Sequence, residues 1–181
     1  MTRIAKHLWV ILAIIISFLV PGCSSISLQD YAENRPRFDL FDFFNGSVRG
    51  WGIVQSRNGT LLRQFVVDIE GQVNSAGQLV LNEDFDWSDG EKSQRIWTIA
   101  KQGEQSFSGR ADDVIDVATG SSAGNALNWR YTLNLDIDDK TWKIAFDDWM
   151  FLQQDNVLIN RATMKKFGFR VGEITIAFMK Q

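Results

Sequence analysis

The chain has 181 residues, and 19 Lys and Arg against 22 Asp and Glu give a formal net charge of −3 at pH 7. It contains one cysteine and one histidine, and 45% of its residues are hydrophobic. Because the balance is mildly acidic, the chain lacks the basic footprint of nucleic-acid binding. The single cysteine excludes an internal disulfide and requires another explanation.

The first predicted element is an uncharged apolar run over residues 8–20, after a basic start. Its 13 residues are fewer than the roughly 20 of a membrane-spanning helix and fit the core of a signal peptide. The last residues, Val20-Pro21-Gly22-Cys23, resemble the bacterial lipobox, in which a signal peptidase cuts before a diacylated cysteine. The resemblance implies a signal peptide over residues 1–22 and palmitate-type lipidation of Cys23. The alternative is an uncleaved N-terminal helix that ends at this cysteine.

Ser24 follows the cysteine in place of Asp, which resembles the pattern exported to the outer membrane of Gram-negative bacteria. We therefore expect a lipid-anchored protein of the outer membrane that faces the periplasm. Cleavage would remove His7, the only histidine, and leave 159 residues. A chain with neither histidine nor free thiol cannot form a Ser-His-Asp triad, a Cys–His pair or a His-ligated zinc site. We predict that the protein is not an enzyme and uses no cofactor or metal.

Residues 23–47 are predicted to form the lipidated N-terminus and a short helical or linker segment. Four phenylalanines in this segment are predicted to plug one end of a barrel: Phe38, Phe41, Phe43 and Phe44.

From about Val48 the sequence is a series of short alternating segments separated by turn signals such as Asn58-Gly59 and Asp89-Gly90. Glycine accepts the positive φ of tight hairpin turns. Eight to ten such segments at near-constant spacing are typical of a sandwich or barrel. We predict an all-β fold, an antiparallel up-and-down barrel of roughly 8–10 strands over residues 48–181. Residues 119–125 are expected to form a loop, residues 136–140 a tight turn, and residues 164–170 a short helical or irregular piece.

Successive strand residues point to opposite faces, so charges on the apolar phase of a strand are predicted to face the interior. Four residues satisfy this pattern: Arg63, Glu83, Asp148 and Arg161. An unpaired inward charge is costly. These groups therefore form a buried ion-pair network, turn outward at bulges, or line the floor or rim of an internal pocket. A barrel of about eight strands is either filled or holds one small ligand, so these interpretations stay open.

Six tryptophans lie after residue 22, and they either line a cavity or fill an aromatic core. In the cavity interpretation the aromatic rings supply contact area, and a charged pair orients a headgroup or carboxylate. The predicted ligand-binding residues combine four tryptophans with the four inward charges: Trp51, Arg63, Glu83, Trp87, Trp129, Asp148, Trp149 and Arg161.

Three stretches carry a resemblance to known families. The stretch FDLFDFFNGSVRGWGIVQSRNG over residues 38–59 is similar to the start of lipocalins, although Gly50 and Trp51 are adjacent where lipocalins have Gly-x-Trp. With GRADDVIDVATGSSAGNALNWRYTL and DDWMFLQQDNVLINRATMKKFG, the chain resembles an uncharacterised family of small proteobacterial lipoproteins, catalogued as a domain of unknown function. The resemblance implies a lipocalin-like barrel tethered to the cell envelope.

The sequence leaves three hypotheses for the function. The leading hypothesis is a binding module that holds a lipid-like or other apolar small molecule. The second is a structural lipoprotein with a filled barrel and an envelope protein as partner. The third is a carboxylate-based enzyme acting on lipid or glycan, which requires Asp113 or Asp148 to meet a carboxylate from another strand.

Overall fold

The computed structural model describes residues 26–137 and 140–181. The predicted signal peptide, Cys23 and part of the predicted turn at residues 136–140 lie outside these residues. Within the two described ranges, none of the helices has the length and apolar character that crossing a membrane requires.

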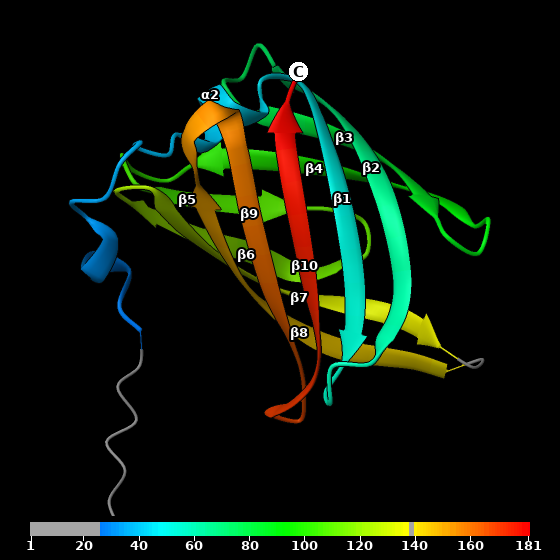
Figure 1. Ribbon diagram of the computed structural model, residues 1–181. Coiled ribbons are helices and arrows are strands. Elements are labelled where there is room, and N and C mark those ends of the chain that lie inside the picture. Colours follow the sequence, from blue (N-terminus) through cyan, green and yellow to red (C-terminus); the bar gives the residue numbers. More distant parts are fainter. Residues whose placement is uncertain (1–25, 138–139) are drawn as a thin grey trace, which may run out of the picture.

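The described chain forms ten antiparallel strands and three short helical segments. Each strand pairs with its neighbours in sequence, and β1 also pairs with β10, which closes the barrel. The strands are β1 Gly46–Ser56, β2 Leu61–Val73, β3 Leu79–Trp87, β4 Lys92–Lys101, β5 Ser106–Arg110, β6 Val114–Ala123, β7 Ala126–Ile137, β8 Lys140–Leu152, β9 Val157–Lys166 and β10 Phe169–Lys180. Figure 1 shows the closed wall. The predicted all-β up-and-down barrel is confirmed.

The hairpin turns match the predicted glycines. Gly59 and Gly90 have φ values of +86° and +89°, the left-handed region that glycine adopts without steric cost. Two expectations were wrong. Residues 119–125 lie largely in β6, and residues 164–170 form the β9–β10 hairpin with Phe167 and Gly168 at its turn.

The small residues that favoured a loop over residues 119–125 have a packing role. Gly120 of β6 faces the ring of Trp129 on β7, and a Cβ at Gly120 would lie 2.2 Å from Trp129 Cε3. A glycine in a strand marks such a close approach. The glycine at position 120 therefore makes room for the indole of Trp129 against the inner wall of the barrel.

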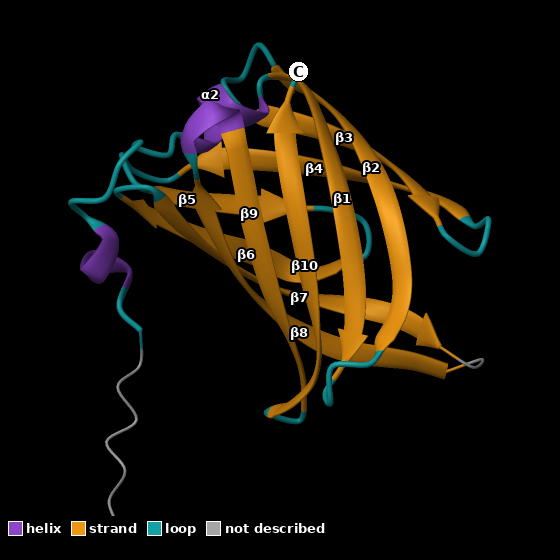
Figure 2. Cartoon of the chain, in the orientation of Figure 1, coloured by secondary structure: helices purple, strands orange, loops and turns teal. Residues whose placement is uncertain are grey.

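A short helix closes one end of the barrel. Helix α2 (Leu40–Phe44) is capped at its N-terminus by Asp39, whose carboxylate accepts hydrogen bonds from the backbone N–H groups of Phe41 and Asp42. In Figure 2 it lies over the end where β1 begins and β10 finishes. The four predicted plug residues are all buried: Phe38, Phe41, Phe43 and Phe44. The predicted plug is confirmed.

The other two helical segments are one turn each. Segment η1 (Leu28–Tyr31) is a 3₁₀ turn, and its Tyr31 packs against the outer rings of Trp149 and Phe151. Segment η2 (Gln154–Asn156) connects β8 to β9.

Candidate functional site in the barrel interior

The barrel interior is filled at the α2 end and accessible toward the opposite end. Beneath α2 the inward side chains are 0–2% exposed; they include Val48, Val67, Ile69, Leu79, Leu127 and Leu158. Nearer the opposite end, inward side chains of several strands are only half-buried; they include Val54, Glu83, Phe85, Trp87, Arg95 and Ile174. Inward residues of a filled barrel are expected to lose their solvent contact. The inward side chains at the second end thus keep partial contact with solvent, and we call this end the mouth of the barrel.

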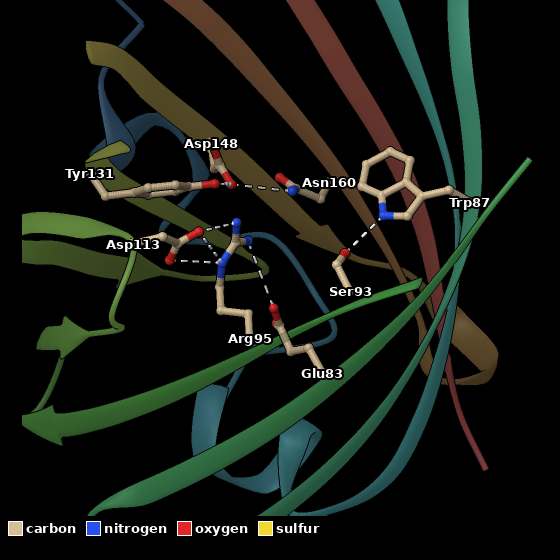
Figure 3. Close-up of polar contacts among 8 residues, drawn as sticks. All are labelled: Glu83, Trp87, Ser93, Arg95, Asp113, Tyr131, Asp148 and Asn160. Atoms are coloured by element: carbon tan, nitrogen blue, oxygen red, sulfur yellow. Dashed lines mark hydrogen bonds and ion pairs between the residues drawn. The ribbon is translucent and has the colours of Figure 1, made fainter. Parts of the chain in front are cut away.

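Six polar residues from five strands and one connecting segment converge below this mouth, and we call them the interior cluster (Figure 3). They are Glu83 of β3, Arg95 of β4, Asp113 of the β5–β6 connection, Tyr131 of β7, Asp148 of β8 and Asn160 of β9. The segments that bear these side chains follow each other around the barrel from β3 to β9. The curvature of the closed barrel brings the side chains together in its interior.

Arg95 lies between two carboxylates. Its Nε and Nη2 donate hydrogen bonds to Asp113, with Nη2–Oδ2 at 2.7 Å, and its Nη1 is 3.9 Å from Glu83 Oε2. The side chains of Asp113, Arg95 and Glu83 are 36%, 23% and 13% exposed. Bidentate pairing of this kind fixes the plane of a guanidinium. Arg95 is therefore already held by the protein's own acids.

Asp148 and Asn160 form the deepest part of the interior cluster, at 4% and 3% exposure. Asp148 Oδ2 accepts a hydrogen bond from Asn160 Nδ2 at 3.3 Å and one from the Tyr131 hydroxyl at 3.4 Å. Both exceed the usual ranges, about 2.7–3.2 Å for N–H···O and about 2.5–3.0 Å for O–H···O. Asp148 Oδ1 and Asn160 Oδ1 are buried and have no hydrogen-bond partner among the residues that the structure describes. Unlike Arg95, this part of the interior cluster leaves two acceptors unused.

Burial sets the protonation of both deep acids. Loss of solvation raises the pKa of Asp148 to about 7, against the lowering effect of its hydrogen bonds from Asn160 and Tyr131. Loss of solvation also raises the pKa of Glu83 to about 7, although Arg95 opposes the shift. A buried carboxyl disfavours its charged form. Near neutral pH each can accept a hydrogen bond when ionised or donate one when protonated.

The mouth has an aromatic and charged rim. Arg63 lies over the ring of Trp87, with Cζ 4.0 Å from the ring centroid, and pairs with Asp89 and Glu91 in the β3–β4 turn. Trp87 Nε1 donates a 2.9 Å hydrogen bond to Ser93 Oγ, and its indole is thereby held in one orientation at the mouth.

Five of the eight predicted ligand-binding residues face the interior. Glu83 and Asp148 belong to the interior cluster, and Arg63 and Trp87 lie at the mouth. Trp129 also faces inward, but it is buried against Trp97, with ring centroids 5.7 Å apart. The inward charges do not pair with one another; Arg63 and Glu83 find partners that the sequence analysis did not single out.

The other three predicted residues face outward, which corrects the prediction. Trp51 is 45% exposed, because Gly50 and Gly52 take the inward positions of β1 against Val67, Phe178 and Phe65. The Arg161 side chain is 63% exposed and pairs with Glu173 on the outer wall.

Trp149 packs outside the barrel, with its ring centroid 5.8 Å from that of Tyr31. It follows Asp148 directly, and adjacent strand residues cannot share a face. Asp148 and Trp149 therefore cannot line the same pocket.

The sequence analysis did not select Arg95, Tyr131 or Asn160. Arg95 alternates with Trp97 and Ile99 in β4, which is the same signal that identified Glu83. Tyr131 lies on the apolar face of β7 with Trp129 and Leu133, where alternation gives no reason to assign it a binding role. The prediction that Arg161 faces inward leaves Asn160 on the outward phase of β9; in the structure Leu158, Asn160 and Ala162 are the buried set.

A separate groove of about 510 Å³ lies where β6 departs from β7 at a register shift between Ile115 and Thr119. Outward side chains supply much of its lining, including Arg130, Asp147 and Lys165. These three form an ion-pair group, with Asp147 3.2 Å from Arg130 and 3.5 Å from Lys165. Tyr131 of the interior cluster also lines the groove, so the groove lies in the wall between this outer ion-pair group and the interior cluster.

The described residues contain no group of three or more His, Cys, Asp and Glu arranged to hold a metal ion. Their interior chemistry is that of hydrogen bonding and ion pairing.

The sequence matches the family described as "Protein of unknown function (DUF3833)" over residues 17–180. The chain belongs to this family. The expected membership of a family catalogued as a domain of unknown function is confirmed at that level. No curated protein matches the sequence.

Two solved structures have a similar fold. A crystal structure of a DUF3598-family protein of unknown function from Nostoc punctiforme matches with a TM-score of 0.58 and 15% identity over 88% of this chain. This chain spans 53% of that protein's length. The S-type phycobiliprotein lyase CPES from Guillardia theta matches with a TM-score of 0.56 and 11% identity, over 78% of this chain and 90% of the lyase. The family member described here thus has a lipocalin-like barrel.

Proposed function

We propose that the protein is a binding module whose barrel holds a small molecule with an apolar body, entered through the mouth. The observation that carries this proposal is the change in exposure along the interior, from inward residues at 0–2% beneath α2 to half-buried ones near the mouth. Ligand sites are typically concave and apolar, with a few convergent polar groups that fix orientation. The interior cluster and the half-buried aromatic rings at the mouth meet this description.

The fold comparison supports the proposal at a coarse level. A barrel of this shape serves in a protein named as a phycobiliprotein lyase. The proposal does not extend that protein's activity to this chain, because 11% identity supports a shared fold only. We propose a binding protein and not an enzyme.

A fluorescence experiment tests the site. The neutral apolar probe N-phenyl-1-naphthylamine accepts energy from tryptophan, so Trp87 at the mouth should report its entry. Val54 faces the interior as a half-buried residue of β1, and Ile53 beside it faces outward. Val54→Trp should weaken probe binding at least about tenfold (about 1.4 kcal/mol) by filling the mouth, and Ile53→Trp should leave it unchanged. Equal binding by both variants would exclude the interior as the site.

We further propose that the protein is anchored by lipid on Cys23 in the outer membrane, facing the periplasm. The support is the basic start, the apolar run and the lipobox-like residues 20–23. Growth of the host with an alkyne analogue of palmitate should label the wild-type protein and not Cys23→Ser. An unlabelled wild-type protein would overturn the anchor and leave the proposal for the barrel intact.

A further inference from the structure

The charges of the interior identify the kind of ligand group that fits at its deep end. Three acids of the interior cluster face one cation: Glu83, Asp113 and Asp148 against Arg95. Arg95 is the cation held deepest among the described inward residues, whereas Arg63 pairs at the rim. Because Arg95 already binds two carboxylates, it has little capacity for a third. A ligand carboxylate or phosphate would meet an acidic surface there.

The unpaired polar atoms at the same place are acceptors, so a ligand would have to supply hydrogen-bond donors to them. Asp148 Oδ1 and Asn160 Oδ1 are both buried and find no hydrogen-bond partner within residues 26–137 and 140–181, and each unsatisfied buried acceptor costs free energy. They lie on β8 and β9, which pair directly, with Asp148 opposite Ala162 and Met150 opposite Asn160. Figure 3 shows the two side chains pointing toward each other and toward the space above Arg95. A donor group bound between the two strands would meet an unpaired acceptor on each of them.

We propose that the ligand enters with a hydrogen-bond donor, a hydroxyl or an N–H group, at its buried end, and that Asp148 and Asn160 bind this group. The ligand is therefore an amphiphile with an alcohol, amide or amine head and not a free fatty acid. This inference rests on the proposed binding function and specifies its ligand class. It also replaces the expectation that a charged pair orients a carboxylate.

The charges around Asp148 make it possible to distinguish a cationic amine head from a neutral alcohol head by the pH dependence of binding. Asp148 is faced by Tyr131 from β7, Asn160 from β9 and Arg95 from β4, with Asp147 beside it in sequence and Glu83 across the interior cluster. As the pH rises from 6 to 8, Asp148 and Glu83 lose protons because their pKa values are about 7. A cationic amine should then bind more tightly. An alcohol should change less, since its hydrogen bond does not depend on opposite charge.

The experiment compares three eight-carbon probes that differ only in the head: octanol, octylamine and octanoate. Each is titrated into the full chain in nonionic detergent by calorimetry at pH 6 and pH 8, with protein-free micelles as the blank. Octanol or octylamine should bind at least about tenfold more tightly than octanoate at pH 8. If octylamine binds more tightly than octanol at pH 8 and its affinity rises from pH 6 to pH 8, the head is cationic; if octanol binds at least as tightly as octylamine at pH 8, the head is neutral.

Two variants test whether Asp148 and Asn160 cause the preference for a donor head. Asn160→Leu and Asp148→Leu each remove one unpaired acceptor at nearly constant side-chain size; each also breaks the Asp148–Asn160 hydrogen bond, so urea unfolding is measured beside binding to separate lost stability from lost recognition. Each should reduce the preference for octanol over octanoate at least about threefold. Arg161→Leu, on the outer wall, is the matched control and should keep the full preference.

The two proposals fail differently. If none of the three probes binds, the proposed binding function is overturned. If octanoate binds as tightly as octanol or more tightly, the donor requirement is overturned and the binding function stands. Unchanged preference in both leucine variants would also overturn the assignment to Asp148 and Asn160.

Discussion

Asp147 and Asp148 are adjacent in β8, and their substitution by asparagine should have opposite effects on stability. Asp148 faces the interior at 4% exposure. Asp147 faces outward, where it pairs with Arg130 and Lys165. Asparagine removes the charge of either residue and nearly keeps its shape. The comparison therefore isolates the environment of the charge.

The magnitude for Asp148 follows from its pKa. Burial raises this pKa from 3.8 to about 7, a difference of about 3 units or about 4 kcal/mol between the folded and unfolded states. Below about pH 4 both states are protonated and no penalty exists. As the pH rises to about 7 the unfolded state loses its proton first, so the folded state loses stability. Above that the penalty is constant. Asp148→Asn should thus stabilise the protein at pH 8 by about 2–4 kcal/mol.

Asp147 behaves in the opposite way. Its hydrogen bonds from Asn128 and Arg130, with the charges of Arg130 and Lys165, outweigh desolvation and lower its pKa. The stabilisation is present above the ordinary carboxyl pKa and is lost as the pH falls through the lowered value. Asp147→Asn should therefore reduce stability at pH 8, by about 0.2–1 kcal/mol for each exposed pair that it removes.

Urea unfolding followed by tryptophan fluorescence at pH 5 and pH 8 measures both effects. Wild type should be less stable at pH 8 than at pH 5, and Asp148→Asn should flatten this difference. The reasoning is refuted if Asp148→Asn is less stable than wild type at pH 8, or if the two asparagine variants change stability in the same direction.

Three further predictions concern packing and the two faces of the wall. Gly120→Ala places a methyl group 2.2 Å from Trp129 Cε3 and should cost about 1–3 kcal/mol, seen as a lower urea midpoint; an unchanged midpoint would mean that the indole has free space. Phe43→Ala removes a ring that is 3% exposed and should cost about 3–5 kcal/mol, whereas Phe167→Ala, at 86% exposure, should change the unfolding free energy by less than about 1 kcal/mol. Trp51→Ala, on the outer wall, should bind N-phenyl-1-naphthylamine like wild type; at least about tenfold weaker binding (about 1.4 kcal/mol) would place part of the site outside the barrel.

The sequence was sufficient for the architecture because each strand carries its own signal. In β7, Leu127, Trp129 and Leu133 alternate with polar residues, and all three are buried. The turns at Gly59 and Gly90 were readable because only positive φ demands glycine there. Such local signals do not depend on how distant strands come together. This explains why the strand number and the order of the hairpins could be predicted.

The residues of the interior cluster could not all be predicted, because the alternation of apolar and polar residues does not determine how neighbouring strands pair. In β9 both phases are apolar, so Val157 and Ile159 were as plausible an inner set as Leu158 and Ala162. The choice was decided by pairing with β8 and β10, which places Asn160 opposite Met150 and Ile176. Since a one-residue error moves every side chain to the other face, Arg161 was predicted in the position that Asn160 occupies. The partner of Glu83 was missed because ion pairing between β3 and β4 is a tertiary contact.

The two ends of the barrel differ in packing and in charge. Four phenylalanines and the inward aliphatic residues beneath α2 supply close packing, whereas the interior cluster holds two carboxyls whose pKa values near 7 reflect an unfavourable burial of charge. Apolar residues at Asp148 and Asn160 would fill the space at lower cost, so stability alone does not account for the acids. A site that binds a donor does account for them, because the ligand would satisfy the two unpaired oxygens. Asp148→Asn should then stabilise the protein at pH 8 and weaken octylamine binding in the same sample, a combination that a purely structural carboxyl would not produce.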